Sequence, residues 1–196
     1  MLETVAFDMP VERAAFLDRD GVLIKNSVRE GRPYPLATTE DFEVLPGVIE
    51  ACGHLRTAGL RLVCVTNQPD IARNLTSASI VDEQNRKLES LLNLDAVLVC
   101  PHDDDDDCPC RKPRPGLLLE GAKLFGLDLP TCVMVGDRWR DIEAGQNAGC
   151  RTVFLDYCYA ERRPVAPDLT VDSLLESVPW ILKTVNPAQL KNVEES

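Results

Sequence analysis

The chain reads AAFLDRDG over residues 14–21, an apolar run that ends in two aspartates and a glycine. Four consecutive apolar residues, rather than alternating ones, are typical of a strand covered on both faces. Strands of this kind predict a parallel sheet buried between helices. Comparable apolar runs recur at residues 60–65, 96–99, 132–135 and 152–155.

Helical spacing of apolar residues appears between and after these runs. Pro46 suits the first turn of a helix and Gly59 the end of one. The alternation predicts an α/β fold with a doubly wound, Rossmann-like parallel sheet, in which ligands bind beyond the carboxyl ends of the strands. For 196 residues we expect a single domain over residues 1–184 and a flexible tail over residues 185–196.

The charge and the apolar content of the chain restrict the kinds of partner that it can bind. Asp and Glu number 32 against 21 Lys and Arg, which gives a net charge of −11 and argues against binding to nucleic acid or an anionic membrane. The chain lacks an apolar stretch of the ~18 residues that a membrane span requires. Residues 1–10 are acidic where a signal peptide would be basic. We therefore expect a cytoplasmic protein that acts on a small molecule.

Polar residues follow the predicted strands, at the edge where their carboxyl ends meet. Carboxylates, a hydroxyl and a lysine in one crevice are suited to binding a divalent cation and a phosphoryl group. Taken singly, each has a plainer explanation, such as a solvated turn or a helix cap. Their joint occurrence in one chain order favours a site. In chain order they are Asp18, Asp20, Thr66, Asn67, Arg111, Lys112 and Asp137.

In these residues the sequence resembles the haloacid dehalogenase superfamily of phosphatases, whose four motifs match residues 16–22, 65–68, 111–113 and 135–141. The spacing between the motifs leaves no room for an inserted cap domain, and a capless relative is expected to be a monomer. Asp18 is the expected nucleophile, since a carboxylate attacks phosphorus to give an aspartyl phosphate.

The remaining groups of the predicted site take their roles from this chemistry. Asp20 is expected to protonate the leaving alkoxide and then to activate water. We expect catalytic Mg²⁺ to bind Asp18, the backbone carbonyl of Asp20 and Asp137. Thr66 and Lys112 would hold the phosphoryl oxygens. Two interpretations of Asp141 remain open. Either its side chain lies beside Lys112, or it is simply a residue in the first turn of a helix.

A second predicted metal site lies just before Lys112. Cys100, His102, Cys108 and Cys110 place three thiols and an imidazole within eleven residues, which suits a closed tetrahedral zinc site. Four protein ligands leave no position for water, so the zinc would be structural. The alternative is free thiols with a surface histidine. The aspartates at 103–107 have no assigned role.

The cysteine loop resembles the branch that contains D-glycero-D-manno-heptose 1,7-bisphosphate 7-phosphatases and histidinol phosphatases, which use magnesium and contain zinc. Residues 36–48 and 114–118 look more like the heptose group, whereas residues 28–35 depart from its flap. The resemblance implies substrate contacts for Asn67 and Arg111. We expect removal of the 7-phosphate from the heptose bisphosphate, with histidinol phosphate as the alternative substrate.

The sequence also bears on two other classes of function. A polynucleotide end phosphatase is opposed by the charge of −11 and by the lack of a basic aromatic groove. A non-catalytic, zinc-stabilised binding module is opposed by the complete set of catalytic groups. The sequence therefore predicts a phosphoric monoester hydrolase that acts on a small phosphorylated sugar or alcohol.

Overall fold

The computed structural model describes residues 12–36 and 38–185. Its main sheet has six strands in the order β5-β4-β1-β6-β7-β8, all paired in parallel. The strands are β1 (Ala14–Leu17), β4 (Arg61–Asn67), β5 (Ala96–Cys100), β6 (Val133–Gly136), β7 (Arg151–Leu155) and β8 (Leu169–Val171). The strand order reverses between β1 and β6, and this is where a doubly wound sheet opens a crevice. The predicted fold class is confirmed.

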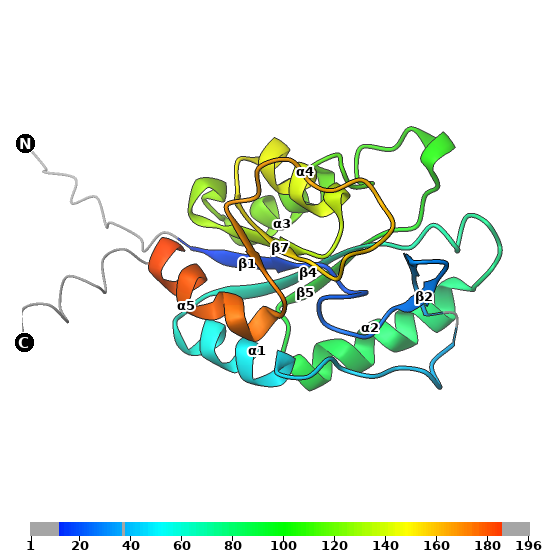
Figure 1. The fold of residues 1–196 in the computed structure, drawn as a ribbon, viewed down its shortest axis with the longest axis horizontal. Coiled ribbons are helices and arrows are strands. Elements are labelled where there is room, and N and C mark those ends of the chain that lie inside the picture. The colour runs from blue at the N-terminus through cyan, green and yellow to red at the C-terminus, as the bar shows by residue number, and fades with distance from the viewer. Residues whose placement is uncertain (1–11, 37, 186–196) are drawn as a thin grey trace, which may run out of the picture.

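Helices cover both faces of the sheet (Figure 1). Three of them pack against one face and two against the other, and the four residues of β1 divide between the two cores. Leu17 faces the first core and Phe16 the second, and both are fully buried. The first face carries α1 (Val48–Thr57), α2 (Ala78–Leu92) and α5 (Leu174–Val185); the second carries α3 (Gly116–Phe125) and α4 (Trp139–Ala148).

Local sequence signals set the helix boundaries. The Ser77 side chain accepts a hydrogen bond from the backbone of Ile80 and caps α2. Gly126 and Gly149 end α3 and α4 in the left-handed conformation. Helix α5 runs to the buried Val185, one residue into the expected tail, and the remainder of that tail lies outside the described residues.

A two-stranded hairpin follows β1 and was not predicted. It pairs β2 (Ser27–Arg29) with β3 (Arg32–Tyr34) through a turn in which Glu30 and Gly31 both have positive φ, as the tight turns of hairpins require. Between β1 and β4 the described residues hold only this hairpin, α1 and loops, so no cap domain is inserted there. Among the described helices, none is long and apolar enough to span a membrane.

Candidate active site

Three buried carboxylates meet at the crevice between β1 and β6. Asp18 follows β1, Asp137 follows β6, and Asp141 lies in the first turn of α4. Oxygens of the three groups lie within 4.8 Å of one another. Burial raises the pKa of Asp18 to about 7. Burial, and then the charge of Asp18, raises the pKa of Asp137 well above its usual value.

This carboxylate cluster fits a hard divalent cation. Oδ1 of Asp137 is buried and has no hydrogen-bond partner, and an orphaned buried carboxylate oxygen is costly unless a ligand satisfies it. Oxygen donors are the preferred ligands of Mg²⁺. The side chain of Asp20 does not belong to this cluster; its expected contribution is the backbone carbonyl.

Lys112 lies among the same carboxylates and is 2% exposed. Its Nζ donates to Oδ1 of Asp18 at 2.7 Å and to the backbone carbonyl of Val65 at 2.8 Å. It also contacts Oδ1 of Asp141 at 2.6 Å. Burial opposes the charged form, but the charges of Asp141 and Asp18 keep the pKa of Lys112 above its usual range. The ammonium is therefore fixed and charged.

Both open interpretations of Asp141 are correct at once. One carboxylate oxygen contacts Lys112, and the other, Oδ2, accepts a hydrogen bond from the backbone N–H of Arg138 at 3.0 Å. This second contact caps the N-terminus of α4. The first turn of α4 thus fixes the carboxylate that orients the lysine.

Asp20 is held by residues that the sequence analysis missed. Arg19 Nε donates to Oδ2 of Asp20 at 3.0 Å, and Gln68 Nε2 donates to the same oxygen at 2.7 Å. Gln68 also donates to the hydroxyl of Thr66 at 2.9 Å. Arg19 is fully buried and is anchored on Asn85 of α2 at 2.9 Å. The available signal for Asn85 was a pair of polar residues, Gln84 and Asn85, among the apolar positions of the helix pattern that became α2.

Asp137 is oriented by close packing at a turn. Gly21 has φ +94°, and a Cβ at this position would lie 1.9 Å from Oδ2 of Asp137. Asn26 Nδ2 donates to the same oxygen at 3.1 Å and to the hydroxyl of Tyr159 at 2.7 Å. Neither Asn26 nor Tyr159 was predicted. Together these groups leave only Oδ1 of Asp137 unpartnered.

The two predicted substrate contacts, Asn67 and Arg111, have protein partners of their own. Asn67 Nδ2 donates to the carbonyl of Lys112 at 3.1 Å, and the N–H of Lys112 donates back to Oδ1 of Asn67 at 3.1 Å. Arg111 Nε donates to Asp104 at 2.9 Å and its Nη1 to the carbonyl of His102 at 3.1 Å. Asn67 thus fixes the backbone that carries the lysine.

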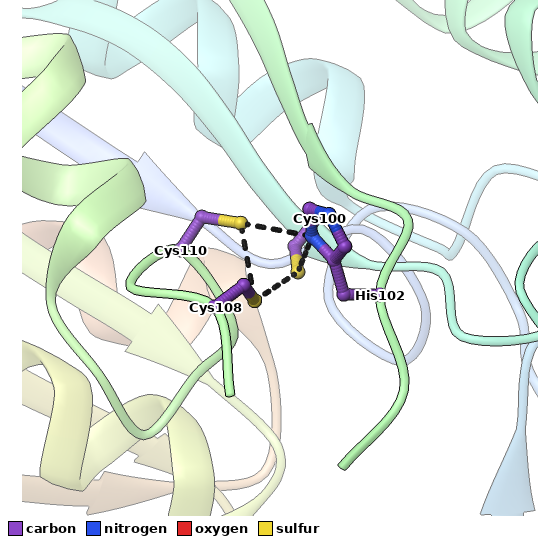
Figure 2. Close-up of side chains that lie close together, drawn as sticks. All are labelled: Cys100, His102, Cys108 and Cys110. Carbon is purple, nitrogen blue, oxygen red and sulfur yellow. Dashed lines mark hydrogen bonds between the residues drawn. The ribbon is translucent and has the colours of Figure 1, made fainter. Parts of the chain in front are cut away.

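The four cysteine-loop residues converge on one point, as Figure 2 shows. The Sγ atoms of Cys108 and Cys110 are 3.4 Å apart, and Cys100 Sγ lies 3.6 Å from that of Cys108. His102 Nδ1 is 3.4 Å from Cys110 Sγ. Zn–S bonds of about 2.3 Å in a tetrahedron place the sulfurs roughly 3.8 Å apart. The cluster fits zinc, with Nδ1 as the histidine ligand.

An arginine-lined cleft adjoins the carboxylate cluster. It has a volume of about 360 Å³, and a smaller pocket over Asp18 shares Tyr34, Asn67 and Arg140 with it. The arginines that line the cleft are Arg32, Arg73, Arg111, Arg138, Arg140 and Arg162. The lining also includes Asp70, Asp104 and Glu161, which pair with some of these arginines. Arginines still outnumber acidic residues in the lining, in a chain with a net charge of −11, and this favours an anionic ligand.

The parallel sheet and the carboxylate–lysine site at its β1–β6 edge define the class of protein. A family model described as haloacid dehalogenase-like hydrolase matches residues 34–149. The chain belongs to this hydrolase family. It is therefore an enzyme, and the alternative of a non-catalytic module is set aside.

The chain is similar in sequence to phosphatases of one kind. D-glycero-beta-D-manno-heptose-1,7-bisphosphate 7-phosphatase of Helicobacter pylori J99 is 37% identical over 142 residues, which cover 69% of this chain and 78% of the relative. The enzyme of that name from Haemophilus influenzae is 33% identical over 190 residues, 88% of this chain and 98% of the relative.

Solved structures agree in fold. The D,D-heptose 1,7-bisphosphate phosphatase of B. bronchiseptica, complexed with magnesium and phosphate, has a TM-score of 0.72 at 27% identity and covers 88% of this chain and 99% of its own. A putative haloacid dehalogenase-like phosphatase of Mesorhizobium loti has a TM-score of 0.74 at 29% identity, with 90% and 88% covered.

Proposed function

We propose that this enzyme removes the 7-phosphate from D-glycero-D-manno-heptose 1,7-bisphosphate. The observation that carries the proposal is the arginine-lined cleft beside the carboxylate–lysine site. A substrate with a phosphate at each end would place one phosphate on Lys112 and extend the other toward Arg111. Histidinol phosphate has a single phosphate and would offer no second phosphate to the arginines of the cleft.

The proposed reaction runs in two steps at the groups around Asp18. Its carboxylate attacks phosphorus in line, so a bond from Asp18 to phosphorus forms as the bond to the sugar oxygen breaks. Asp20 gives its proton to the departing alkoxide. Asp20 then takes a proton from water, which attacks the aspartyl phosphate and releases inorganic phosphate. Arg19 and Gln68 keep the carboxylate of Asp20 aimed at the oxygen that departs.

Lys112 and Thr66 are proposed to hold the phosphoryl oxygens during both steps. Preorganised donors stabilise developing charge most when they need not move. Lys112 meets this condition because Asp18, Asp141 and the carbonyl of Val65 fix its Nζ. Mg²⁺, bound by Asp18, Asp137 and the backbone carbonyl of Asp20, would supply further positive charge against the phosphate.

We propose zinc as a structural ligand of Cys100, His102, Cys108 and Cys110. The last of these cysteines is two residues from Lys112 in the chain, so the metal would fix the loop that presents the lysine. Purified protein is expected to contain about one equivalent of zinc, and changing both Cys108 and Cys110 to Ser should remove it. Elemental analysis measures this directly.

The matched control for the zinc experiment is Cys158→Ser, because Cys158 is exposed and outside the cluster. This variant should keep its zinc. Equal zinc content in the double variant and the control would contradict the proposed ligand set.

The substrate is tested by measuring kcat/KM for the heptose 1,7-bisphosphate and for histidinol phosphate with the same Mg²⁺ concentration. We expect the bisphosphate to be preferred by at least about 100-fold, because a site built for a charged group discriminates strongly against a substrate that lacks it. Comparable values, or a preference for histidinol phosphate, would overturn the substrate assignment and leave the hydrolase class intact.

The oligomeric state of the enzyme and its cellular compartment are proposals as well. We infer a monomer that acts in the cytoplasm on a small phosphorylated sugar. A cleft of about 360 Å³ is of the size that holds a small molecule, which supports a phosphorylated sugar as the substrate.

A further inference from the structure

Three carboxylates line the arginine-rich cleft, and two of them pair with one arginine each: Asp70 with Arg73 and Glu161 with Arg138. The third, Asp104, contacts two arginines. Oδ1 of Asp104 accepts hydrogen bonds from Arg111 Nε and from Arg140 Nη1, both at 2.9 Å. All three residues line the cleft. Asp104 belongs to the aspartate run 103–107, for which no role was expected, yet it occupies the position between two guanidinium groups where an anionic ligand would bind.

The two arginines keep other contacts that do not involve Asp104. Arg111 donates through Nη1 to the carbonyl of His102 at 3.1 Å. The guanidinium of Arg140 lies over the ring of Trp139, with 4.8 Å between its Cζ and the ring centroid. Arg111 is therefore held without Asp104, and Arg140 has a second contact that restrains it. Their N–H donors remain in place for another anion when the aspartate leaves.

Asp104 differs in its contacts from the other aspartates of the loop. Asp103 is fixed by two hydrogen bonds from Arg73, at 2.6 and 2.7 Å, and caps the 3₁₀ turn Asp104–Asp106. Asp105 makes no ion pair with any residue that the structure describes. Asp104 is hydrogen-bonded to two arginines of the cleft, and its side chain is 52% exposed. Asp103 also lies 3.9 Å from Arg111, but the arginine that donates hydrogen bonds to it is Arg73. The side chains of Arg111 and Arg140 are 10% and 25% exposed, so the two ion pairs of Asp104 are partly exposed, and the solvent on the Asp104 side weakens them and allows another anion to replace the carboxylate.

We propose that Asp104 is a built-in counter-anion that the second phosphate of the substrate displaces from Arg111 and Arg140. Asp104 would then be a specificity-determining residue, which sets the affinity for bisphosphates relative to monophosphates. The inference rests on the proposed function for the identity of the substrate. A phosphate carries more negative charge than a carboxylate and offers three oxygens to the two guanidinium groups. It therefore displaces the Asp104 carboxylate from the two arginines.

The exchange has a consequence for selectivity. Anions that carry a single charge, which are common in any cell, gain little by replacing one carboxylate with another. A phosphate dianion gains more, because both arginines remain oriented to receive it. Displacing Asp104 costs every anion the same free energy, so Asp104 lowers the affinity of the cleft for all of them by the same factor, and only the more tightly bound dianion still occupies the cleft.

The kinetic test compares Asp104→Asn with Asp105→Asn, which makes the same charge change in the same turn without touching an arginine. Asp104→Asn should lower KM for heptose 1,7-bisphosphate by about threefold to tenfold, the effect of two partly exposed ion pairs. It should leave kcat, and KM for heptose 7-phosphate, unchanged. A higher KM for the bisphosphate, or equal shifts in both variants, would overturn the proposal.

A binding test separates this inference from the proposed substrate. Inorganic sulfate serves as the probe dianion, and tryptophan fluorescence reports its binding because Trp139 borders Arg140. Asp104→Asn should bind sulfate about threefold to tenfold more tightly than Asp105→Asn. Equal Kd values would contradict the role of Asp104. If the two variants differ in sulfate binding but neither heptose phosphate is hydrolysed, the proposed substrate is wrong and the proposed role of Asp104 stands.

Discussion

Asp18→Asn is expected to lower kcat for the heptose bisphosphate by at least about 10³-fold, because an amide is a poor nucleophile towards phosphorus and removing a nucleophile costs several orders of magnitude. The substitution preserves the shape of the side chain, so the geometry around Lys112 should persist. Release of inorganic phosphate with saturating Mg²⁺ measures the rate. Mass spectrometry of quenched reactions should find no phosphorylated form of the variant.

Stability distinguishes lost chemistry from lost folding in this variant. Asparagine removes one of three mutually repelling carboxylates, and Lys112 keeps its contacts with Asp141 and Val65. The thermal midpoint of Asp18→Asn without Mg²⁺ should therefore not fall below that of the parent protein. A variant that folds and retains its kcat would refute Asp18 as the nucleophile.

Lys112→Met is expected to lower the free energy of unfolding by about 3–5 kcal/mol in metal-free protein. The substitution leaves three buried carboxylates without their cation, and removing one partner of a buried ion pair costs the desolvation of those that remain. Urea unfolding in the absence of Mg²⁺ gives the value. Phosphatase activity should also be lost, since the phosphoryl oxygens lose their fixed donor.

Lys25→Met is the matched control for this second variant. Lys25 pairs with Glu43 at 3.4 Å, but its side chain is 62% exposed. Surface pairs of this kind contribute at most about 1 kcal/mol. If both lysine variants unfold at the same urea concentration as the parent protein, the buried ion-pair network around Lys112 does not stabilise the fold as described.

The sheet and the strand-end residues were predictable because each rests on a local pattern. Buried runs such as Ala14–Leu17 and Val133–Gly136 are short and continuously apolar, and a polar group follows each one directly. Parallel strands present these polar groups at one edge. Asp18 meets Asp137 for this reason, whereas Lys112, 94 positions from Asp18, reaches the site through the loop after β5 whose backbone Asn67 holds.

The remaining parts depend on packing that no local pattern encodes. Arg19 acquires its role because Asn85 of α2 anchors its guanidinium, and Gln68 because its amide reaches both Asp20 and Thr66. The aspartate run looked like a solvated loop because its arginine partners, such as Arg140, come from distant elements. The hairpin and β8 were missed because each of their strands has only three residues.

The turn at Gly21 shows how little evolutionary freedom the site leaves at one position. Any side chain there would begin inside the space of the Asp137 carboxylate, with its first carbon 1.9 Å from an oxygen. The hydrogen of glycine is the largest substituent that this turn admits. The loops that contact the substrate can vary in sequence, but glycine is the one residue that this position accepts without displacing Asp137.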